Sequence, residues 1–365
     1  MKHWFSFIFL ICINLYGNAQ YKVVFTLHSY PLQFEGDSIF IAGNFNNWDP
    51  HNASFSLIGT QESTKSTTKV LPPGDYEYKC TRGSWLQTEC DKMGNDITNH
   101  HFTITGDTSI EINIQAWKDE FKKAAKQHTA SKHVQIMDTA FYMPQLKRTR
   151  RIWVYLPEGY QQTKKHYPVI YIHDGQNVFD DYTSGFGEWG VDESLDSLIK
   201  IGKPACIVIG IDNGKERMSE YNPYEFILER KGGGTAQKFL PEGAEYINFI
   251  TETLKPLVDK KYRTLSDKTN TIIAGSSMGG LISYYAMLQR PDIFGKAGIF
   301  SPAFWTAPAI KGLTDSLAEK TNGKFFFYMG GKERGTSIND MQDLQELLGE
   351  KSKGMIYSVI DPTGE

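Results

Sequence analysis

The chain has two regions with different patterns of hydrophobic and polar residues. In the first, up to about residue 114, short β-rich runs are separated by Gly, Pro, Asn and Asp turns. Strand alternation is clear in YEYKC, where Tyr76 and Tyr78 share one face of a strand and charged residues occupy the other. This pattern predicts a small immunoglobulin-like β-sandwich over residues 20–116.

In the second region, apolar strands alternate with amphipathic helices. The strand-like runs end in polar residues or glycine, and they are PVIYIHDG, ACIVIGID, NTIIAGSS, KAGIFSP, KFFFYMGG and MIYSVID. Apolar residues follow helical spacing in EGAEYINFITETLKPLVDKKY and INDMQDLQELLGEK. This alternation predicts an α/β fold for residues 133–365, with a mostly parallel sheet covered on both faces. The charged segment 117–132 is expected to link the two domains.

The first residues are typical of a secretory signal peptide. Lys2 precedes an apolar run from Trp4 to about Tyr16, and Ala19 suits a cleavage site. The run is shorter than the roughly 20 residues of a spanning helix. We therefore predict that residues 1–19 are a signal and that the protein is secreted or periplasmic, with no membrane span after cleavage. A buried first helix and an uncleaved anchor are the alternatives.

Charge and cysteine content narrow the partners and cofactors. The formal net charge of −3 leaves no basic surplus for neutralising phosphates, so nucleic acid is not an expected partner. Beyond the signal, the cysteines are Cys80, Cys90 and Cys206, without a CxxC motif, and no metal or cofactor is expected. Cys206 lies in an apolar strand and reads as an inert core thiol. Whether Cys80 and Cys90 pair is left open.

A nucleophile motif follows one of the apolar strands. TIIAGSSMGGLISYYAMLQRP contains G-x-S-x-G with Ser277 at its centre, between a strand and a helix. Such a strand, sharp turn and helix present an exposed serine hydroxyl, so Ser277 is the predicted nucleophile. The amide of Met278, at the helix start, is the first predicted oxyanion donor, and Gly175 and Gln176 supply the second. The alternative is an ordinary glycine-rich turn.

Several segments in order resemble one family. YIHDGQNVFD, EWGVDE, IGIDN…R…EYNPYEF, IAGSSMGGLISYYAML and FGKAGIFSPAFW resemble the esterase family of α/β-hydrolases that includes S-formylglutathione hydrolase, feruloyl esterases, enterochelin esterases and mycolyltransferases. The likeness runs from about His133 to the last residue. It implies an α/β-hydrolase fold and a triad in the order Ser, acid, His. Glu333 lies at the expected acid position, with Asp361 and Asp340 as alternatives.

The histidine that this order requires is absent from the sequence. All nine histidines, from His3 to His173, precede Ser277. Members of the family often continue after their last strand with Gly, a polar residue and His, which is where VIDPTGE stops. We therefore expect a truncated esterase, cut at or just before its catalytic histidine, that binds substrate but scarcely turns it over.

The expected reaction is ester hydrolysis through a covalent acyl-enzyme. The predicted substrate is an acyl group on a sugar or another bulky alcohol. Further residues are expected at the substrate pocket, although each could equally serve packing: His173, Asp174, Trp189, Arg217, Glu220, Tyr221 and Trp305. Acyl transfer between sugars would use the same serine and is left open.

The N-terminal region carries a second resemblance. IFIAGNFNNWDP, PPGDYEYKCTRGSW and DITNHHF are similar to starch- and glycogen-binding modules, including that of the AMP-activated kinase β-subunit. By position, Trp48 and Trp85 would stack on sugar rings while Lys79 and Asn99 bind hydroxyls. The step from Lys79 to Trp85 is one residue shorter than in the kinase module. This adds a polysaccharide to the candidate partners and leaves a catalytically silent carbohydrate-binding protein as the alternative function. Both tryptophans could instead be packing residues.

Overall fold

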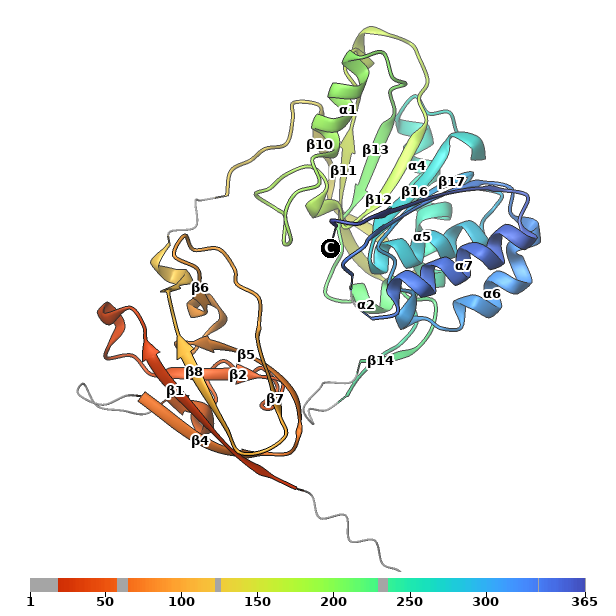
Figure 1. Ribbon diagram of the computed structural model, residues 1–365. Coiled ribbons are helices and arrows are strands. Elements are labelled where there is room, and N and C mark those ends of the chain that lie inside the picture. The colour runs from red at the N-terminus through yellow and green to blue at the C-terminus, as the bar shows by residue number, and fades with distance from the viewer. Residues whose placement is uncertain (1–18, 58–64, 122–125, 229–235, 334, 365) are drawn as a thin grey trace, which may run out of the picture. The chain divides into compact units, whose positions relative to one another are not determined.

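A computed structural model describes the chain over residues 19–57, 65–121, 126–228, 236–333 and 335–364 (Figure 1). The described residues form two compact units, one up to Phe121 and one from Lys126 onward, with Ala236 grouped in the first. The expected signal peptide lies outside the described residues except for Ala19. Within the described part, no helix combines the length and apolar character needed to span a bilayer.

Unit 1 is an all-β structure. Its strands are β1 (Tyr21–Ser29), β2 (Ile39–Gly43), β3 (Ser56–Leu57), β4 (Lys65–Leu71), β5 (Gly74–Thr81), β6 (Glu89–Cys90), β7 (His100–Ile104), β8 (Thr108–Asn113) and β9 (Ala116–Trp117). They pair as β4-β1-β8, β3-β2-β5-β7 and β6-β9. Alternate residues of β1, such as Val23 and Phe25, share one core with Ile41 of β2 and Tyr78 of β5. The two larger sheets therefore pack against each other.

The segment predicted as a linker, residues 117–132, is largely part of the two units. Trp117 is fully buried in the core of unit 1. At the other end, the amide of Thr129 donates to Asp180 and that of Ser131 donates to Asp192, both in unit 2. Both described ends of this segment therefore contact their own unit, and its role as a linker stays a prediction.

Unit 2 contains an eight-stranded sheet. Its strands are β10 (Val134–Met143), β11 (Arg148–Tyr155), β12 (Val169–His173), β13 (Ile207–Ile211), β16 (Thr271–Ser276), β17 (Lys296–Phe300), β18 (Lys324–Gly330) and β19 (Met355–Asp361). Their order is β10-β11-β13-β12-β16-β17-β18-β19, and a separate hairpin pairs β14 (Phe226–Leu228) with β15 (Gln237–Phe239). The β10/β11 and β11/β13 pairs are antiparallel and the remaining pairs of the large sheet are parallel. The predicted mostly parallel sheet is confirmed.

Helices cover both faces of this sheet (Figure 1). They are α1 (Val191–Lys200), α2 (Arg217–Glu220), α3 (Gly243–Asn248), α4 (Lys255–Lys261), α5 (Met278–Gln289), α6 (Ile310–Leu317) and α7 (Ser337–Lys351). Residues of β11 alternate between two cores: Ile152 packs with the α5 side, and Trp153 packs with the α1 side. This alternation is what a sheet buried on both faces requires.

The predicted long helix of residues 242–262 is interrupted. A π-helical stretch, Phe249–Leu254, lies between α3 and α4. Pro256, at the start of α4, lacks an amide hydrogen and cannot donate to the preceding turn. The wider π turn accommodates that missing hydrogen bond.

The three cysteines of the described residues are buried free thiols. The pairing of Cys80 and Cys90 that the sequence left open does not occur in this structure. Burial raises the pKa of Cys206 to about 12, which keeps that thiol protonated at neutral pH.

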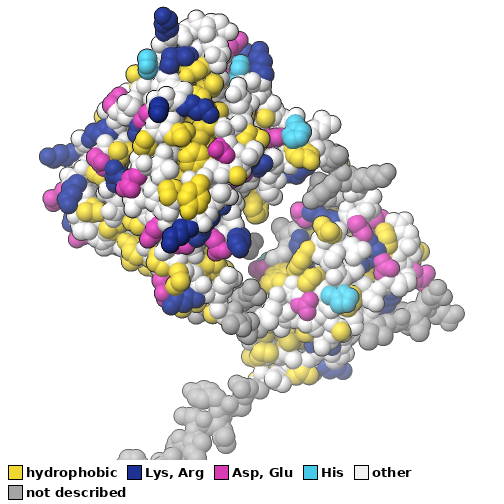
Figure 2. All heavy atoms as spheres, turned by 180° about the vertical axis from the view of Figure 1, so that it is seen from behind, with side chains coloured by type: hydrophobic (Ala, Val, Ile, Leu, Met, Phe, Trp, Pro, Cys, Tyr) yellow, Lys and Arg dark blue, Asp and Glu magenta, His cyan; other side chains and the backbone are white. Residues whose placement is uncertain are grey.

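The surface matches the balanced composition. On the face seen in Figure 2, acidic and basic side chains are interspersed, with hydrophobic side chains between them. Any binding site must therefore be defined by its local geometry and not by a large surface of one charge. Because β12, β13 and β16 are parallel neighbours, their carboxyl ends meet at one edge, where a site is expected.

Candidate active site

Ser277 occupies a strained turn between β16 and α5. Its backbone has φ 57° and ψ −119°, a rare conformation for a residue with a side chain. The amide of Ser277 donates to the Phe300 carbonyl at 2.9 Å, and the Ser277 carbonyl accepts from Ala303 at 3.0 Å and Leu281 at 3.1 Å. These bonds hold the turn from both sides. Ser277 is exposed, although Ser276 before it is half-buried and Met278 after it is buried.

Close packing explains the first glycine of the motif. A Cβ on Gly275 would lie 2.8 Å from the carbonyl carbon of Gly279 and 2.8 Å from Cδ2 of His173. Real Cβ atoms do not approach other atoms so closely, so a side chain at this position would displace the helix or the histidine. The serine can therefore sit at the tight turn only with glycine at residue 275.

The predicted oxyanion donors lie at two neighbouring strand ends. Met278 begins α5, where the first amides lack intrahelical partners. Gly175 follows β12, the parallel neighbour of β16, and a Cβ on it would meet the backbone of β13 at 2.7 Å. Next to it, Oε1 of Gln176 accepts from the Asn213 amide at 3.1 Å, which fixes this loop to the end of β13.

A cavity of about 560 Å³ opens at this edge of the sheet. Its lining residues are Asp174, Asn177, Phe186, Trp189, Asn213, Arg217, Ser276 and Ser277. It brings together four of the predicted residues, namely Ser277, Asp174, Trp189 and Arg217. The other lining residues were not predicted from the sequence, namely Asn177, Phe186, Asn213 and Ser276. Asn177 and Asn213 follow the ends of β12 and β13, and that position was the available signal.

Charge inside the cavity is concentrated in one pair. Nε and Nη2 of Arg217 donate to the two carboxylate oxygens of Asp174 at 2.7 and 2.9 Å, and Nδ2 of Asn213 adds a bond at 2.6 Å. Asp174 itself has a left-handed backbone with φ 57°. These two charges neutralise each other. The rest of the cavity then has a polar side with amide groups and an aromatic side formed by Trp189 and Phe186.

Three predicted pocket residues are instead packed inside the protein. His173 is 1% exposed, and Nδ1 of its ring is 2.9 Å from the Tyr246 hydroxyl. Glu220 and Tyr221 are fully buried; Glu220 pairs with Arg148 and Arg150, and the Tyr221 hydroxyl accepts from the Asp174 amide. The prediction that they contact substrate is therefore wrong.

A fourth predicted pocket residue, Trp305, is exposed but does not line this cavity. Its short 3-10 helix, Phe304–Thr306, follows β17. Its place on the rim stays a prediction.

The acid candidates lie at the ends of the last two strands and on α7. Glu333 is half-buried just past β18, and its Oε1 accepts from the Gly330 amide at 3.2 Å. Asp361 ends β19 beside Gly330; hydrogen bonds from Thr363 and then from Tyr328 lower its pKa. Asp340 accepts from Thr336 on the first turn of α7. None of the three lines the cavity, and within the described ranges no hydrogen bond joins a histidine to Ser277.

Comparison with known proteins settles the family. A family model described as "Putative esterase" matches residues 144–352, more than half of the chain. The chain belongs to this esterase family. The matched residues include the turn at Ser277 and every residue that lines the cavity around it.

The relatives align with this chain over only part of their length or of its length. An endo-1,4-beta-xylanase/feruloyl esterase of Xylanibacter ruminicola is 27% identical over 297 residues, which are 80% of this chain and 36% of that protein. Ferri-bacillibactin esterase BesA of Bacillus subtilis is 34% identical over 173 residues, which are 43% of this chain and 56% of that protein. The enterobactin esterase of Shigella flexneri, with a TM-score of 0.51 and 16% identity, covers 90% of this chain and 83% of its own. That structural likeness confirms the α/β-hydrolase fold.

Proposed function

We propose that this chain is a serine carboxylic-ester hydrolase with Ser277 as its nucleophile. Membership of the esterase family gives ester hydrolysis as the reaction class. One observation carries the serine mechanism: the exposed Ser277 side chain stands on a strained turn, at the N-terminus of α5, inside the 560 Å³ cavity. A turn of this kind is expected where a hydroxyl must be presented to a substrate.

In this mechanism Oγ of Ser277 attacks the ester carbonyl carbon and its proton passes to a base. The carbonyl oxygen becomes negative, and the amides of Met278 and of Gly175 or Gln176 would donate hydrogen bonds to it. The intermediate collapses when the alcohol leaves with a proton, which gives an acyl-enzyme that water hydrolyses. Glu333 is the proposed acid that would orient an imidazole base.

The two sides of the cavity suggest the substrate class. Trp189 and Phe186 offer aromatic surface, while Asn177 and Asn213 offer amide groups. An acylated sugar, or a similar bulky ester, has apolar ring faces and hydroxyls that match both sides. The name of the Xylanibacter relative, a xylanase and feruloyl esterase, supports an ester on a carbohydrate. We further propose secretion or periplasmic location, since such substrates lie outside the cell.

Residue-level labelling tests the nucleophile. With imidazole added as the base, a fluorophosphonate probe should modify Ser277, as read by mass spectrometry, and Ser277→Ala should abolish this labelling and the imidazole-supported hydrolysis of p-nitrophenyl acetate. Ser316→Ala, at an exposed serine of α6, is the matched control. Because no described histidine bonds to Ser277, added imidazole should raise the rate above that of Ser277→Ala in the same buffer. Labelling at another residue, or equal rates in the two proteins, would contradict the proposal.

A second candidate function rests on a concavity of about 300 Å³ in unit 1. Its lining residues are Trp48, Lys79, Trp85, Thr88, Asp96, Asn99 and Lys118. All four residues expected to bind sugar are among them. The rings of Trp48 and Trp85 are 6.3 Å apart at 42°, so they make a bent platform. Such a surface supports binding of a curved glucan chain, with Lys79 and Asn99 at its edge.

Titration calorimetry with β-cyclodextrin, and retention on insoluble starch, test this site. Trp48→Ala and Trp85→Ala should each weaken binding by about tenfold or more, since buried aromatic contacts dominate such interfaces. Trp305→Ala, at an exposed tryptophan of unit 2, is the control. Unchanged binding in both unit 1 variants would assign the rings to packing.

A further inference from the structure

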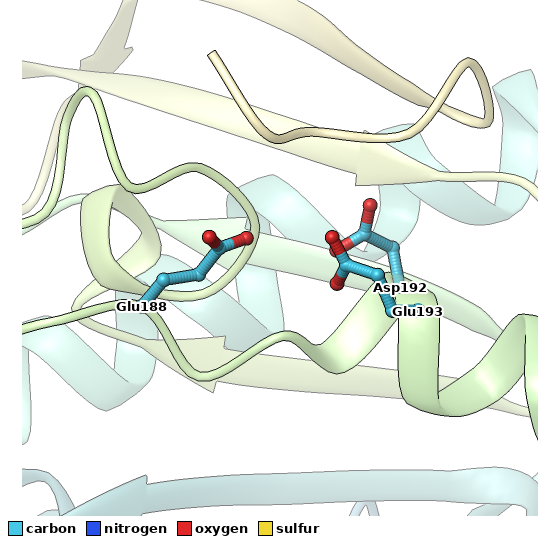
Figure 3. Close-up of side chains that lie close together, drawn as sticks. All are labelled: Glu188, Asp192 and Glu193. Atoms are coloured by element: carbon cyan, nitrogen blue, oxygen red, sulfur yellow. The ribbon is translucent and has the colours of Figure 1, made fainter. Parts of the chain in front are cut away.

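Three carboxylates of unit 2 converge outside the cavity (Figure 3). Figure 3 shows the Glu188 side chain, from the loop before α1, directed toward those of Asp192 and Glu193 in the first turn of that helix. One oxygen from each of the three lies within 4.8 Å of the others. No metal site was predicted from the sequence, because only the cysteines were considered as ligands. These acidic residues come from a different part of the chain.

Two of these carboxylates have buried oxygens without partners. Asp192 is fully buried; its Oδ2 accepts from the Ser131 amide at 2.7 Å, but its Oδ1 has no hydrogen-bond partner among the described residues. Glu188 repeats the pattern: Oε2 accepts from Oγ1 of Thr129 at 2.5 Å, and Oε1 is buried and unpartnered. A charged oxygen that is buried without a partner is unfavourable, so these two oxygens call for a cation.

No basic side chain of the described residues forms an ion pair with these three carboxylates. None of the ion pairs found within the described residues involves Glu188, Asp192 or Glu193. The N-terminus of α1 favours nearby acidic residues, which accounts for Asp192 and Glu193. It does not account for Glu188, which comes from a loop and whose carboxylate is directed toward the other two (Figure 3).

We propose that Glu188, Asp192 and Glu193 bind a calcium ion. The donors are all carboxylate oxygens, which select a hard cation over zinc or copper. Calcium takes oxygen ligands at about 2.3–2.6 Å in a flexible geometry, whereas magnesium demands near-ideal octahedral geometry at about 2.0–2.1 Å. The three oxygens lie within 4.8 Å of one another, and the flexible coordination of calcium tolerates such an irregular set of ligands. Water completes the coordination at the exposed side of Glu193.

The site would join three segments of unit 2. Glu188 and Asp192 already hold Thr129 and Ser131, so the ion fixes the chain entering the unit onto α1. Trp189, next to Glu188, lines the cavity around Ser277, and its backbone amide donates to the Asn177 carbonyl. Calcium therefore stabilises the unit and one wall of the cavity. Only the effect on that wall rests on the proposed function; binding of the ion does not.

Thermal unfolding and calorimetry of the full chain, stripped of metal and titrated with calcium chloride, test the site. The dissociation constant is expected near 10⁻⁴–10⁻³ M, roughly that of extracellular calcium modules. Calcium should raise the melting temperature of the wild type and of Glu346→Gln, an exposed control on α7. Glu188→Gln and Glu193→Gln should weaken binding by about tenfold or more. Magnesium at equal concentration should have a smaller effect.

Other outcomes overturn the proposal. An equal calcium shift in the wild type and both glutamine variants would place the ion elsewhere. The proposal would also be overturned if calcium had no effect and Glu193→Gln alone stabilised the protein. That would mean a proton shared between Asp192 and Glu193 relieves the repulsion; partial burial and then the neighbouring carboxylates do raise the pKa of Glu193. Both readouts are independent of esterase activity, so an inactive protein does not affect the result.

Discussion

Arg217 binds Asp174 through both carboxylate oxygens, from Nε at 2.7 Å and from Nη2 at 2.9 Å. Asp174 directly precedes Gly175, so this pair fixes the backbone that is proposed to donate to the oxyanion. Lysine cannot reproduce the two-point geometry. Arg217→Lys is therefore expected to lower the imidazole-supported kcat about tenfold, the effect of 1.4 kcal/mol on a barrier.

The control for this change is Arg263→Lys. Arg263 contacts Tyr160 and Lys165 at the opposite end of the sheet, before β12 begins. Its replacement should leave kcat within about twofold of wild type. A similar loss of kcat in both variants would show a general effect on stability and not a local effect on the oxyanion loop.

Gly175 allows the loop after β12 to approach β13. A Cβ there would lie 2.7–2.9 Å from backbone atoms of Gly210, Ile211 and Asp212, which cannot rotate away. Gly175→Ala should lower the free energy of unfolding by about 1–3 kcal/mol, as measured by urea denaturation. In contrast, Gly312→Ala on α6 has open space around it and should raise stability by about 0.5–1 kcal/mol. Equal midpoints for the two variants would contradict the packing argument.

The sequence predicted those features that depend on local pattern. The strands β12, β13, β16, β17, β18 and β19 all fall on the apolar runs, and the strained turn falls on Ser277 within its glycine motif. The π-helical interruption between α3 and α4 was not predicted, because a proline in an otherwise apolar helical pattern does not fix how the chain adjusts.

Side chains near strand ends were harder to predict, because their direction depends on distant partners. Glu220 is drawn inside by Arg148 and Arg150, which are 72 and 70 residues earlier in the chain. His173 turns toward Tyr246, 73 residues later. Spacing along one segment contains no information on such pairings. The same limit hid the three converging carboxylates, of which Asp192 and Glu193 look like ordinary first-turn acids of α1.

The buried charge of Glu220 gives a stability prediction. Its carboxylate bonds Nη1 of Arg148 at 2.8 Å and contacts Nη2 of Arg150, and it is fully buried. Glu220→Gln leaves the guanidinium group of Arg150 without a counter-charge, while Arg148 keeps its pair with Glu242, and should lower the free energy of unfolding by about 3–5 kcal/mol. Asp315→Asn, which breaks the exposed 2.6 Å pair with Lys351, should cost less than about 1 kcal/mol. Comparable losses in guanidinium denaturation would contradict the assignment of Glu220 to the core.

His173 makes stability depend on pH in a definite direction. Burial lowers the pKa of His173 from 6.5 to about 3, while the nearby Asp174 opposes the shift. Between these two values the unfolded chain binds a proton that the folded protein does not. Stability should therefore be complete above about pH 6.5 and fall as the pH drops toward 3, by up to about 1.4 kcal/mol per pH unit from this residue.

His173→Gln removes the titrating group and retains a partner for the Tyr246 hydroxyl. Urea denaturation between pH 4 and 7 should accordingly give a smaller slope of unfolding free energy against pH in this variant than in wild type. Carboxylates titrate in the same window, so the informative quantity is the difference between the two curves. His166→Gln, at an exposed position, controls for replacing a histidine at the surface. Parallel curves for wild type and His173→Gln would mean that His173 is protonated in the folded protein. The assignment of its ring to a buried position packed against Gly275 would then be wrong.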